Sequence, residues 1–398
     1  MSLLSLMSKA QTHKGHTVPH FQDSGSIVPA KTESVNVQSS SVPVWGSMFT
    51  IDVREMNVLV KRGTLDFLLP AITGYTNGKY VPAQYFVDHI DYFQNGEIKY
   101  TAYPVSQFVL QQLYSGSDED RLLGNCASGL YSSTAQRINL ASTANHYYLP
   151  LYDFFKQANG SYPLVDPSHQ LQLRVYLRNL SEVSTGTGTQ TATGITSCNL
   201  LLDVVRLREN EANAIRNDIA KKGLSFKFSD LRQQVNTVNS GVSTATINLQ
   251  SIVGPVSQLC FVVRNSNALS GENAFAFNAI ASFEITNASG SNIVGGQVIN
   301  NAQSLLINGN AYSRSSYLAE NALGTTDNKA NVYIYSFAND PELNIAQAVS
   351  SGSYNFTGAE VLKINFASSL ASNVQVDINA YVDSVITLTR GNSLKTIF

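Results

Sequence analysis

The sequence predicts an all-β protein built of two β-sandwiches or jelly rolls. Three observations predict this fold: short strand-like segments recur along the chain, Gly, Asn and Ser turns separate them, and a single segment has a clear helical pattern. The strand-rich stretches on either side of that segment have similar lengths. Many short strands with almost no helix are typical of sandwiches and barrels. The 398 residues allow two or three domains.

Residues 1–44 are predicted to form an extended arm, because they have no sustained apolar period and contain several Pro, Gly and Ser residues. The arm begins with a short apolar cluster followed by two lysines. These residues are Leu3, Leu4, Leu6, Met7, Lys9 and Lys14. Since such an arm gains order only against a partner, we expect the cluster to contact a membrane or a neighbouring subunit. The three histidines of the arm lack the fixed geometry of a metal site.

Residues 45–205 are predicted to form the first roll. Strand-like segments occur at residues 49–53, 57–60, 64–72, 86–92 and 171–177. Asn-Gly pairs at residues 77–78 and 95–96 predict turns, because these residues readily adopt positive φ. Residues 182–197 are rich in Gly, Thr and Ser and are predicted to form a loop between two strands.

Residues 206–223 are predicted to form a connector helix between the rolls. The segment 206–222 contains eight charges and places Ile215 and Ile219 on one face. Acidic residues near its start and lysines near its end suit the helix dipole, and Gly223 is a suitable stop. Residues 224–398 then form the second roll and a C-terminal tail. Their strand-like segments are 246–249, 258–263, 279–286, 332–337, 360–366 and 374–389.

The composition argues against bulk nucleic-acid binding. Lys plus Arg is 26 and Asp plus Glu is 28, which gives a net charge of -2. A protein that wraps a genome by charge has a marked basic excess. Charged residues are only 14% of the chain, against roughly 25% in average soluble domains. This low value indicates surface that neighbouring subunits cover, where desolvating charge would be costly.

No catalytic, cofactor or metal site is predicted. The dense acidic cluster of Asp118, Glu119 and Asp120 consists of adjacent residues, which cannot face each other across a glycosidic bond. We interpret it as a solvated loop or helix start. The three cysteines lie far apart without paired spacing, and the remaining histidines are isolated. The sequence leaves open a catalytic triad assembled from residues that are distant in the chain. No apolar run reaches the roughly 18 residues that span a bilayer.

Two longer segments carry a family resemblance. Residues 149–177 read LPLYDFFKQANGSYPLVDPSHQLQLRVYL, and residues 332–358 read VYIYSFANDPELNIAQAVSSGSYNFTG. Together with segments that start at Cys198 and Gly254, and in this order, they resemble the double jelly-roll major capsid proteins of tailless icosahedral double-stranded DNA viruses, in the tectivirus-like and large eukaryotic DNA virus lineage. The residues that carry the resemblance are Pro150, Phe154, Phe155, Pro163, Leu164, Tyr335, Ser336, Phe337, Pro341, Glu342, Gly352, Asn355 and Phe356. Asp153 and Ser350 depart from the family's usual residues.

The resemblance implies two tandem eight-stranded jelly rolls joined by a short connector helix. It implies a major capsid protein, not an enzyme, that forms homotrimeric pseudo-hexagonal capsomers in an icosahedral shell, usually over an internal membrane. The implied partners are neighbouring capsomers, penton and minor capsid proteins, and the membrane through the arm, without sequence-specific nucleic-acid binding. The implied location is the virion shell, after assembly in the host cytoplasm. Two alternatives stay open: a jelly-roll carbohydrate-binding or receptor-binding spike protein, and a β-sandwich hydrolase.

Overall fold

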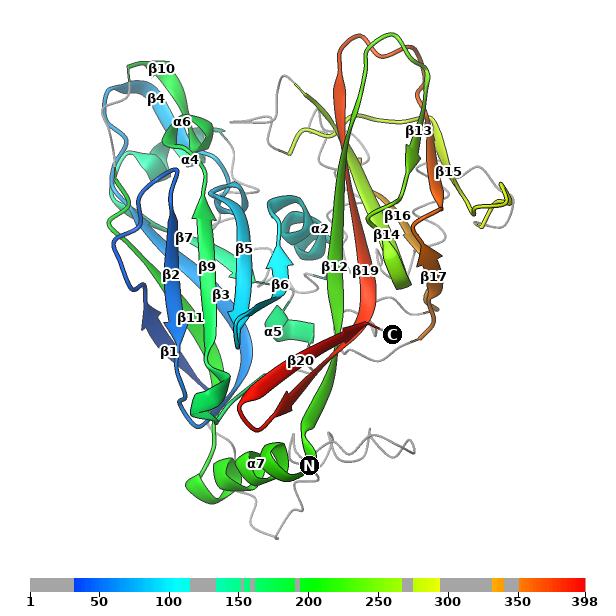
Figure 1. The fold of residues 1–398 in the computed structure, drawn as a ribbon. Helices are drawn as coiled ribbons and strands as arrows, with labels where there is room; N and C mark the ends of the chain where they lie inside the picture. Colours follow the sequence, from blue (N-terminus) through cyan, green and yellow to red (C-terminus); the bar gives the residue numbers. More distant parts are fainter. Residues whose placement is uncertain are drawn as a thin grey trace.

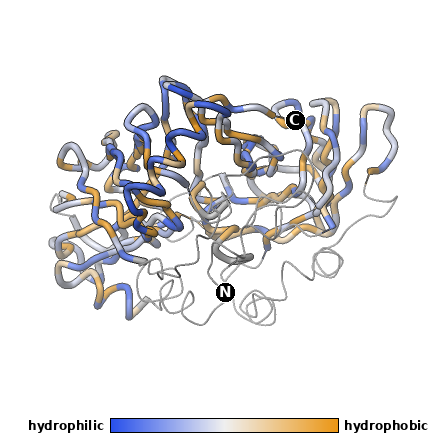
Figure 2. The backbone as a smooth tube through the Cα atoms, turned by 90° about the horizontal axis from the view of Figure 1, so that it is seen from below, coloured by the Kyte–Doolittle hydropathy of each residue, from blue (hydrophilic) through white to orange (hydrophobic). Residues whose placement is uncertain are grey.

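The computed structural model describes residues 32–114, 134–151, 154–157, 162–189, 194–266, 275–293, 331–339 and 351–397. Within these ranges most elements are antiparallel strands, and they form two rolls that lie side by side (Figure 1). The predicted all-β fold with two rolls is therefore confirmed. Viewed from below in Figure 2, hydrophobic and hydrophilic residues alternate along much of the chain, as expected for strands with one buried face.

The first roll consists of two main sheets packed face to face. One sheet has the order β1-β11-β3-β7, with β8 paired to β3. Its strands are β1 (Thr32–Gln38), β3 (Val58–Leu69), β7 (Asn145–Leu151), β8 (Tyr162–Leu164) and β11 (Ser197–Arg206). The other has the order β2-β9-β5-β6. Its strands are β2 (Met48–Val53), β5 (Val87–Gln94), β6 (Glu97–Ala102) and β9 (Leu171–Leu177). Alternate residues of β9 are buried, as the period of two in the sequence predicts.

The second roll has the same layered construction. Its larger sheet has the order β12-β19-β14-β16, with β17 paired to β14 and β20 paired to β19. Its strands are β12 (Leu224–Val238), β14 (Val253–Asn265), β16 (Tyr333–Ser336), β17 (Tyr354–Thr357), β19 (Val374–Thr389) and β20 (Asn392–Ile397). The smaller sheet, β13-β18-β15, covers one face of the larger sheet and encloses a core with it. Its strands are β13 (Thr244–Asn248), β15 (Ser282–Thr286) and β18 (Val361–Asn365).

A continuous hydrophobic core joins the two rolls. The core of the first roll continues into side chains of the second, among them Phe228, Val262 and Tyr381. Helices α2 (Pro104–Tyr114) and α5 (Phe154–Gln157) lie between the rolls (Figure 1). The larger sheet of the second roll therefore has two buried faces, because it packs on its own partner sheet and on the first roll.

The connector is helix α7 (Glu209–Lys222), which begins three residues later than predicted because Arg206 is the last residue of β11. Its first turn is capped by Glu211, whose carboxylate accepts a hydrogen bond from the backbone N–H of Arg208 at 2.8 Å. Ile215 and Ile219 are buried on one face, as expected. The helix ends at Gly223, which has a φ of 75° and donates its backbone N–H to the carbonyl of Ile219.

The end of the predicted arm is a strand, which corrects its boundary at residue 44. All seven residues of β1 pair with β11, and Val35 and Val37 pack against the core of the first roll. Glu33 forms an ion pair with Arg206. The sequence pattern does not predict this strand, because polar and apolar residues alternate over only a short, half-buried stretch. The predicted contact residues Leu3, Leu4, Leu6, Met7, Lys9 and Lys14 lie outside the described residues.

Two of the predicted connections differ from the structure, and one is confirmed. Asn77 and Gly78 lie inside strand β4 (Tyr75–Tyr80), where an irregular register accommodates the positive φ of Asn77. Part of the predicted loop forms β10 (Ser184–Gly188), which pairs with β4. A Cβ at Gly186 would lie 2.7 Å from the side chain of Tyr75, so the glycine permits this close pairing. The turn at Asn95-Gly96 is confirmed between β5 and β6, and both residues have positive φ.

The correction at β1 yields a testable prediction. A variant that starts at Val42 should lose roughly 2–3 kcal/mol of stability, because it loses the half-buried Val35 and Val37 and exposes the edge of β11. A variant that starts at Lys31 retains β1 and serves as the matched control. Denaturant unfolding followed by the fluorescence of Trp45, the single tryptophan, measures both. Equal stability of the two variants would show that β1 contributes nothing to the first roll.

Candidate functional site at the joint between the rolls

The joint between the rolls has an aromatic zone at α5. Phe154 stacks on Tyr92 of the first roll with ring centroids 4.7 Å apart, and it reaches Phe228 of β12 at 6.4 Å. Tyr162 of β8 contacts Phe226 of β12 edge to face at 5.5 Å. Aromatic pairs at these distances add specific attraction to their area burial. The zone therefore packs the first roll against β12, the first strand of the second roll.

A second aromatic zone lies at α2. Phe108 of this helix stacks on Phe275 with centroids 4.6 Å apart and contacts Phe277 edge to face at 5.5 Å. Tyr85 of the first roll also contacts Phe275, at 6.0 Å. The segment that follows β14 in sequence thus places two phenylalanines against the first roll.

A buried ion pair lies on the larger sheet of the second roll. The Arg264 Nε donates to Asp377 Oδ2 at 2.6 Å, and both side chains are almost fully buried. The side-chain amide of Gln375 donates to the other carboxylate oxygen at 2.6 Å. Burial raises the pKa of Tyr85 in the first roll, and the positive charges of Arg178 and Arg264 partly oppose that shift. The pair is therefore close enough to the first roll to affect it electrostatically.

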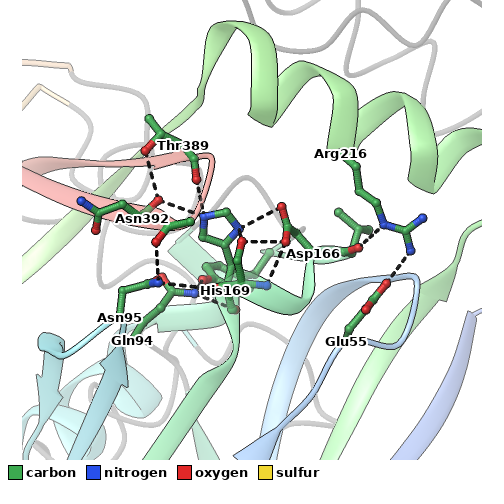
Figure 3. A network of polar contacts seen from close by, with 12 residues as sticks. Glu55, Gln94, Asn95, Asp166, His169, Arg216, Thr389 and Asn392 are labelled. Carbon is green, nitrogen blue, oxygen red and sulfur yellow. Dashed lines mark hydrogen bonds and ion pairs between the residues drawn. The ribbon is translucent and has the colours of Figure 1, made fainter.

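A polar network closes the joint at the α7 end (Figure 3). The His169 Nε2 lies 2.7 Å from the carbonyl oxygen of Thr389 and 2.9 Å from that of Asn392. Because both acceptors are carbonyls, Nε2 carries a proton. On the other side of the ring, Nδ1 lies 3.5 Å from the carboxylate of Asp166. The histidine thus bridges the first roll and the β19–β20 hairpin of the second.

Asp166 and Arg216 connect this network to α7. Burial raises the pKa of Asp166, but hydrogen bonds from Ser168 and the charges of His169 and Arg216 outweigh burial and lower it overall. Arg216 of α7 contacts Glu55 Oε1 at 2.5 Å and Glu209 Oε1 at 3.1 Å. The connector helix therefore binds the first roll through the side chain of Arg216.

Two lysines, the buried Lys99 and the partly buried Lys395, lie at the same end of the joint. The Lys99 Nζ donates to the carbonyl of Ser393 and to Glu97 Oε2, both at 2.6 Å. The Lys395 Nζ donates to Asp230 Oδ1 at 2.6 Å and to the carbonyl of Lys99 at 2.8 Å. Burial lowers the pKa of Lys395, while the charge of Asp230 opposes that shift. Each ammonium group therefore has both a charged and a neutral acceptor.

The structure places the residues of the family motif in two separate groups. Pro150, Phe154, Phe155, Pro163 and Leu164 lie in β7, α5 and β8 of the first roll. In the second roll Tyr335 and Ser336 end β16, Phe337 follows them, Gly352 precedes β17, and Asn355 and Phe356 lie in β17. Phe337 contacts Tyr335 at 4.9 Å and Phe356 at 5.4 Å, so this second group forms one aromatic cluster. Pro341 and Glu342 lie outside the described residues.

Sequence reasoning missed most of the charged residues at the joint. Asp377 lies in the strand-like segment 374–389, and Arg264 directly follows the apolar run 259–263. Charged residues are rarely fully buried unless they are paired, so a charge within a buried strand is the signal that could have found them. Nothing in the sequence indicates which opposite charge is the partner.

Among the described residues we find no arrangement of side chains typical of a catalytic or metal-binding site. They contain no group of three metal-ligating side chains, and no helix among them has the length and apolar composition to cross a membrane. Cys198 and Cys260 are buried, and burial raises the pKa of Cys260 to about 12. The acidic cluster Asp118, Glu119 and Asp120 lies outside these residues. The side chains at the joint bind one another, which is an arrangement that holds two rolls in place.

Comparison with known proteins shows the fold. No family model and no curated protein sequence matches the chain. Among solved structures, PBCV-1 VP54 fitted into a reconstruction of the virophage Sputnik has a TM-score of 0.69 and 16% identity, covering 95% of this chain and 100% of that chain. The Faustovirus major capsid protein has a TM-score of 0.63 and 10% identity, covering 97% and 96%. The chain therefore has the double jelly-roll fold of these proteins, as predicted.

Proposed function

We propose that this chain is the major capsid protein of an icosahedral double-stranded DNA virus. The observation that carries the proposal is the extent of the structural similarity, which spans nearly all of this chain and nearly all of the Faustovirus major capsid protein. Both rolls and their connection are matched together, whereas a lectin or hydrolase built on a single jelly roll would match one roll.

The joint supports a structural role. A shell subunit must keep its two rolls at a constant angle, because each roll contacts different neighbours. Two aromatic zones and a polar network hold the rolls together. Hydrogen bonds in a buried network are strengthened by the low local dielectric, which favours one arrangement of the groups that make them.

Self-association is the next part of the proposal. We expect homotrimers that form pseudo-hexagonal capsomers, with neighbouring capsomers, penton and minor capsid proteins as further contacts. Val42, Val44 and Met48 of the first roll are exposed apolar side chains, of the kind that a neighbouring subunit covers. The small net charge of -2 favours close packing of copies.

The arm is proposed to reach an internal membrane or a neighbouring subunit. Its first described residues pair beside the connector: Thr32 lies opposite Val205, and Glu33 pairs with Arg206. Strand β1 therefore begins at the α7 end of the first roll, and we assign this end to the inner face of the shell. The variant that starts at Lys31 should keep the fold but assemble poorly, whereas normal membrane-containing particles from it would contradict this role.

Light scattering and electron microscopy of the purified full-length chain test the main proposal. We expect a mass of three 43.2-kDa chains and pseudo-hexagonal particles that form sheets or shells at high concentration. A chain that stays monomeric at micromolar concentration contradicts the proposal. Glycan binding by a small oligomer that forms no sheets would favour the carbohydrate-binding alternative.

A further inference from the structure

The β19–β20 hairpin reaches from the second roll to the α7 end of the first (Figure 1). Thr389 and Asn392 are paired, so the turn consists of Arg390 and Gly391 alone. Gly391 has a φ of 74°, which a tight two-residue turn requires. The tip of the hairpin therefore has one defined backbone shape.

Three side chains of the first roll bind this tip through its backbone. His169 donates to the carbonyls of Thr389 and Asn392, and Lys99 donates to that of Ser393. The Asn95 Nδ2 lies 3.3 Å from the carbonyl of Gly391. Four carbonyls of a five-residue stretch thus accept hydrogen bonds from the first roll. Because every acceptor is a main-chain oxygen, these donors recognise the shape of the turn and not its side chains.

The segments that carry the donors are also bound to one another within the first roll. Asn95 also donates to the carbonyl of Ser168 at 2.9 Å, and Gln94 donates to the carbonyl of His169 at 2.9 Å. The side chains of His169 and Lys99 are 2% and 0% exposed. With the hairpin in place these donors are buried, and buried donors without acceptors are costly, so loss of the hairpin's carbonyls at this position is unfavourable.

We propose that Asn95, Lys99 and His169 form a socket for the backbone of a tight β-hairpin, and that the C-terminal hairpin in this socket is the latch that sets the angle between the two rolls. The aromatic contacts of Phe108 and Phe275 attach the rolls at α2, farther from α7 (Figure 1). The aromatic zone at α5 is a further attachment. The latch adds one near α7, at a distance from the attachment at α2, and attachments at separate points oppose rotation of one roll against the other. The inference concerns the single chain and does not depend on the proposed capsid function.

A one-residue insertion tests the latch in the full-length chain. Glycine inserted after Gly391 leaves Asn95, Lys99 and His169 unchanged but moves the carbonyls of Asn392 and Ser393 out of register. Spin labels at the exposed positions Asp52 and Thr246 report the distance between the rolls. The labels are placed in a Cys126→Ser background and diluted with unlabelled protein, since Cys198 and Cys260 are buried.

We expect one narrow distance distribution for the parent chain and a broad one for the insertion variant. Amide exchange of β20 should accelerate roughly tenfold or more, because several buried hydrogen bonds are lost together. Two controls should resemble the parent chain. Arg390→Ala removes an exposed side chain but no carbonyl, and glycine inserted after Gly194 lengthens a connection of the first roll away from the socket.

The outcomes separate the proposal from its alternatives. A folded insertion variant with the parent's distance distribution and exchange rates overturns the latch. An effect of Arg390→Ala as large as that of the insertion overturns backbone recognition. If the insertion variant does not fold, as judged by Trp45 fluorescence, His169→Gln and Asn95→Ala provide the same test with smaller changes. Loss of trimers with an unchanged distance distribution concerns the proposed function and not the latch.

Discussion

Replacing Asp377 by alanine is expected to destabilise the protein by about 3–5 kcal/mol, since it leaves a buried charge without its partner. The guanidinium of Arg264 donates to this carboxylate at 2.6 Å, and the side chains are 7% and 2% exposed. Denaturant unfolding followed by Trp45 fluorescence measures the loss.

Two matched variants show whether the unpaired charge is the cause. Arg264→Met combined with Asp377→Leu removes both charges and should recover most of the loss, because apolar residues of similar size often replace a buried pair without cost. Arg62→Ala breaks an exposed pair with Asp203, in which the arginine is 62% exposed, and should cost less than about 1 kcal/mol. A double variant as unstable as Asp377→Ala would show that the charge is not responsible.

Replacing Phe154 by alanine is expected to cost about 3–5 kcal/mol, because it leaves a cavity at the centre of the joint. The ring is 2% exposed and contacts Tyr92, Tyr162 and Phe228. Since Phe228 belongs to the second roll, the cavity should weaken both the first core and the attachment of the second roll. Thermal unfolding and amide exchange of β12 measure the two effects.

Phe154→Leu is the matched control, since it keeps most of the volume and should cost less than about 1.5 kcal/mol. A double-mutant cycle with Phe228→Ala isolates the contact between the rolls, and we expect a coupling of roughly 0.5–1.5 kcal/mol. Additive losses within error would mean that Phe154 stabilises only the first roll and has no role in the joint.

Where the pattern of the sequence was long and regular, it predicted the elements well. Residues 171–177 alternate apolar and polar side chains and form β9 over the same range. The charged segment around Ile215 and Ile219 forms α7. Short or ambiguous segments were predicted poorly. Residues 32–38 and 184–188 have few buried side chains and become strands through pairing with β11 and β4. Their local sequence does not contain that information.

The same distinction applies to the motif residues and to the contacts at the joint: the local sequence indicates which side chains are buried, but not which distant residues they contact. Phe154 and Phe155 stand out in the sequence as an aromatic pair beside a turn, and their burial follows from their size and apolar character. The partner of Phe154 in the second roll, Phe228, is 74 positions away and carries no signal of that contact. The socket is similar, because Lys99 and the carbonyl that it binds are separated by 294 positions.

By itself the sequence determined the all-β class, the division into two rolls, the connector helix and the low charge of the surface. These properties depend on periodicity and composition, which act over neighbouring residues. Only the tertiary structure decided which charges pair, that β1 and β10 are strands, and that His169 and Lys99 hold the hairpin of the second roll. Such contacts join residues far apart in the chain, and a buried polar group is stable only where the fold brings its partner within hydrogen-bond distance.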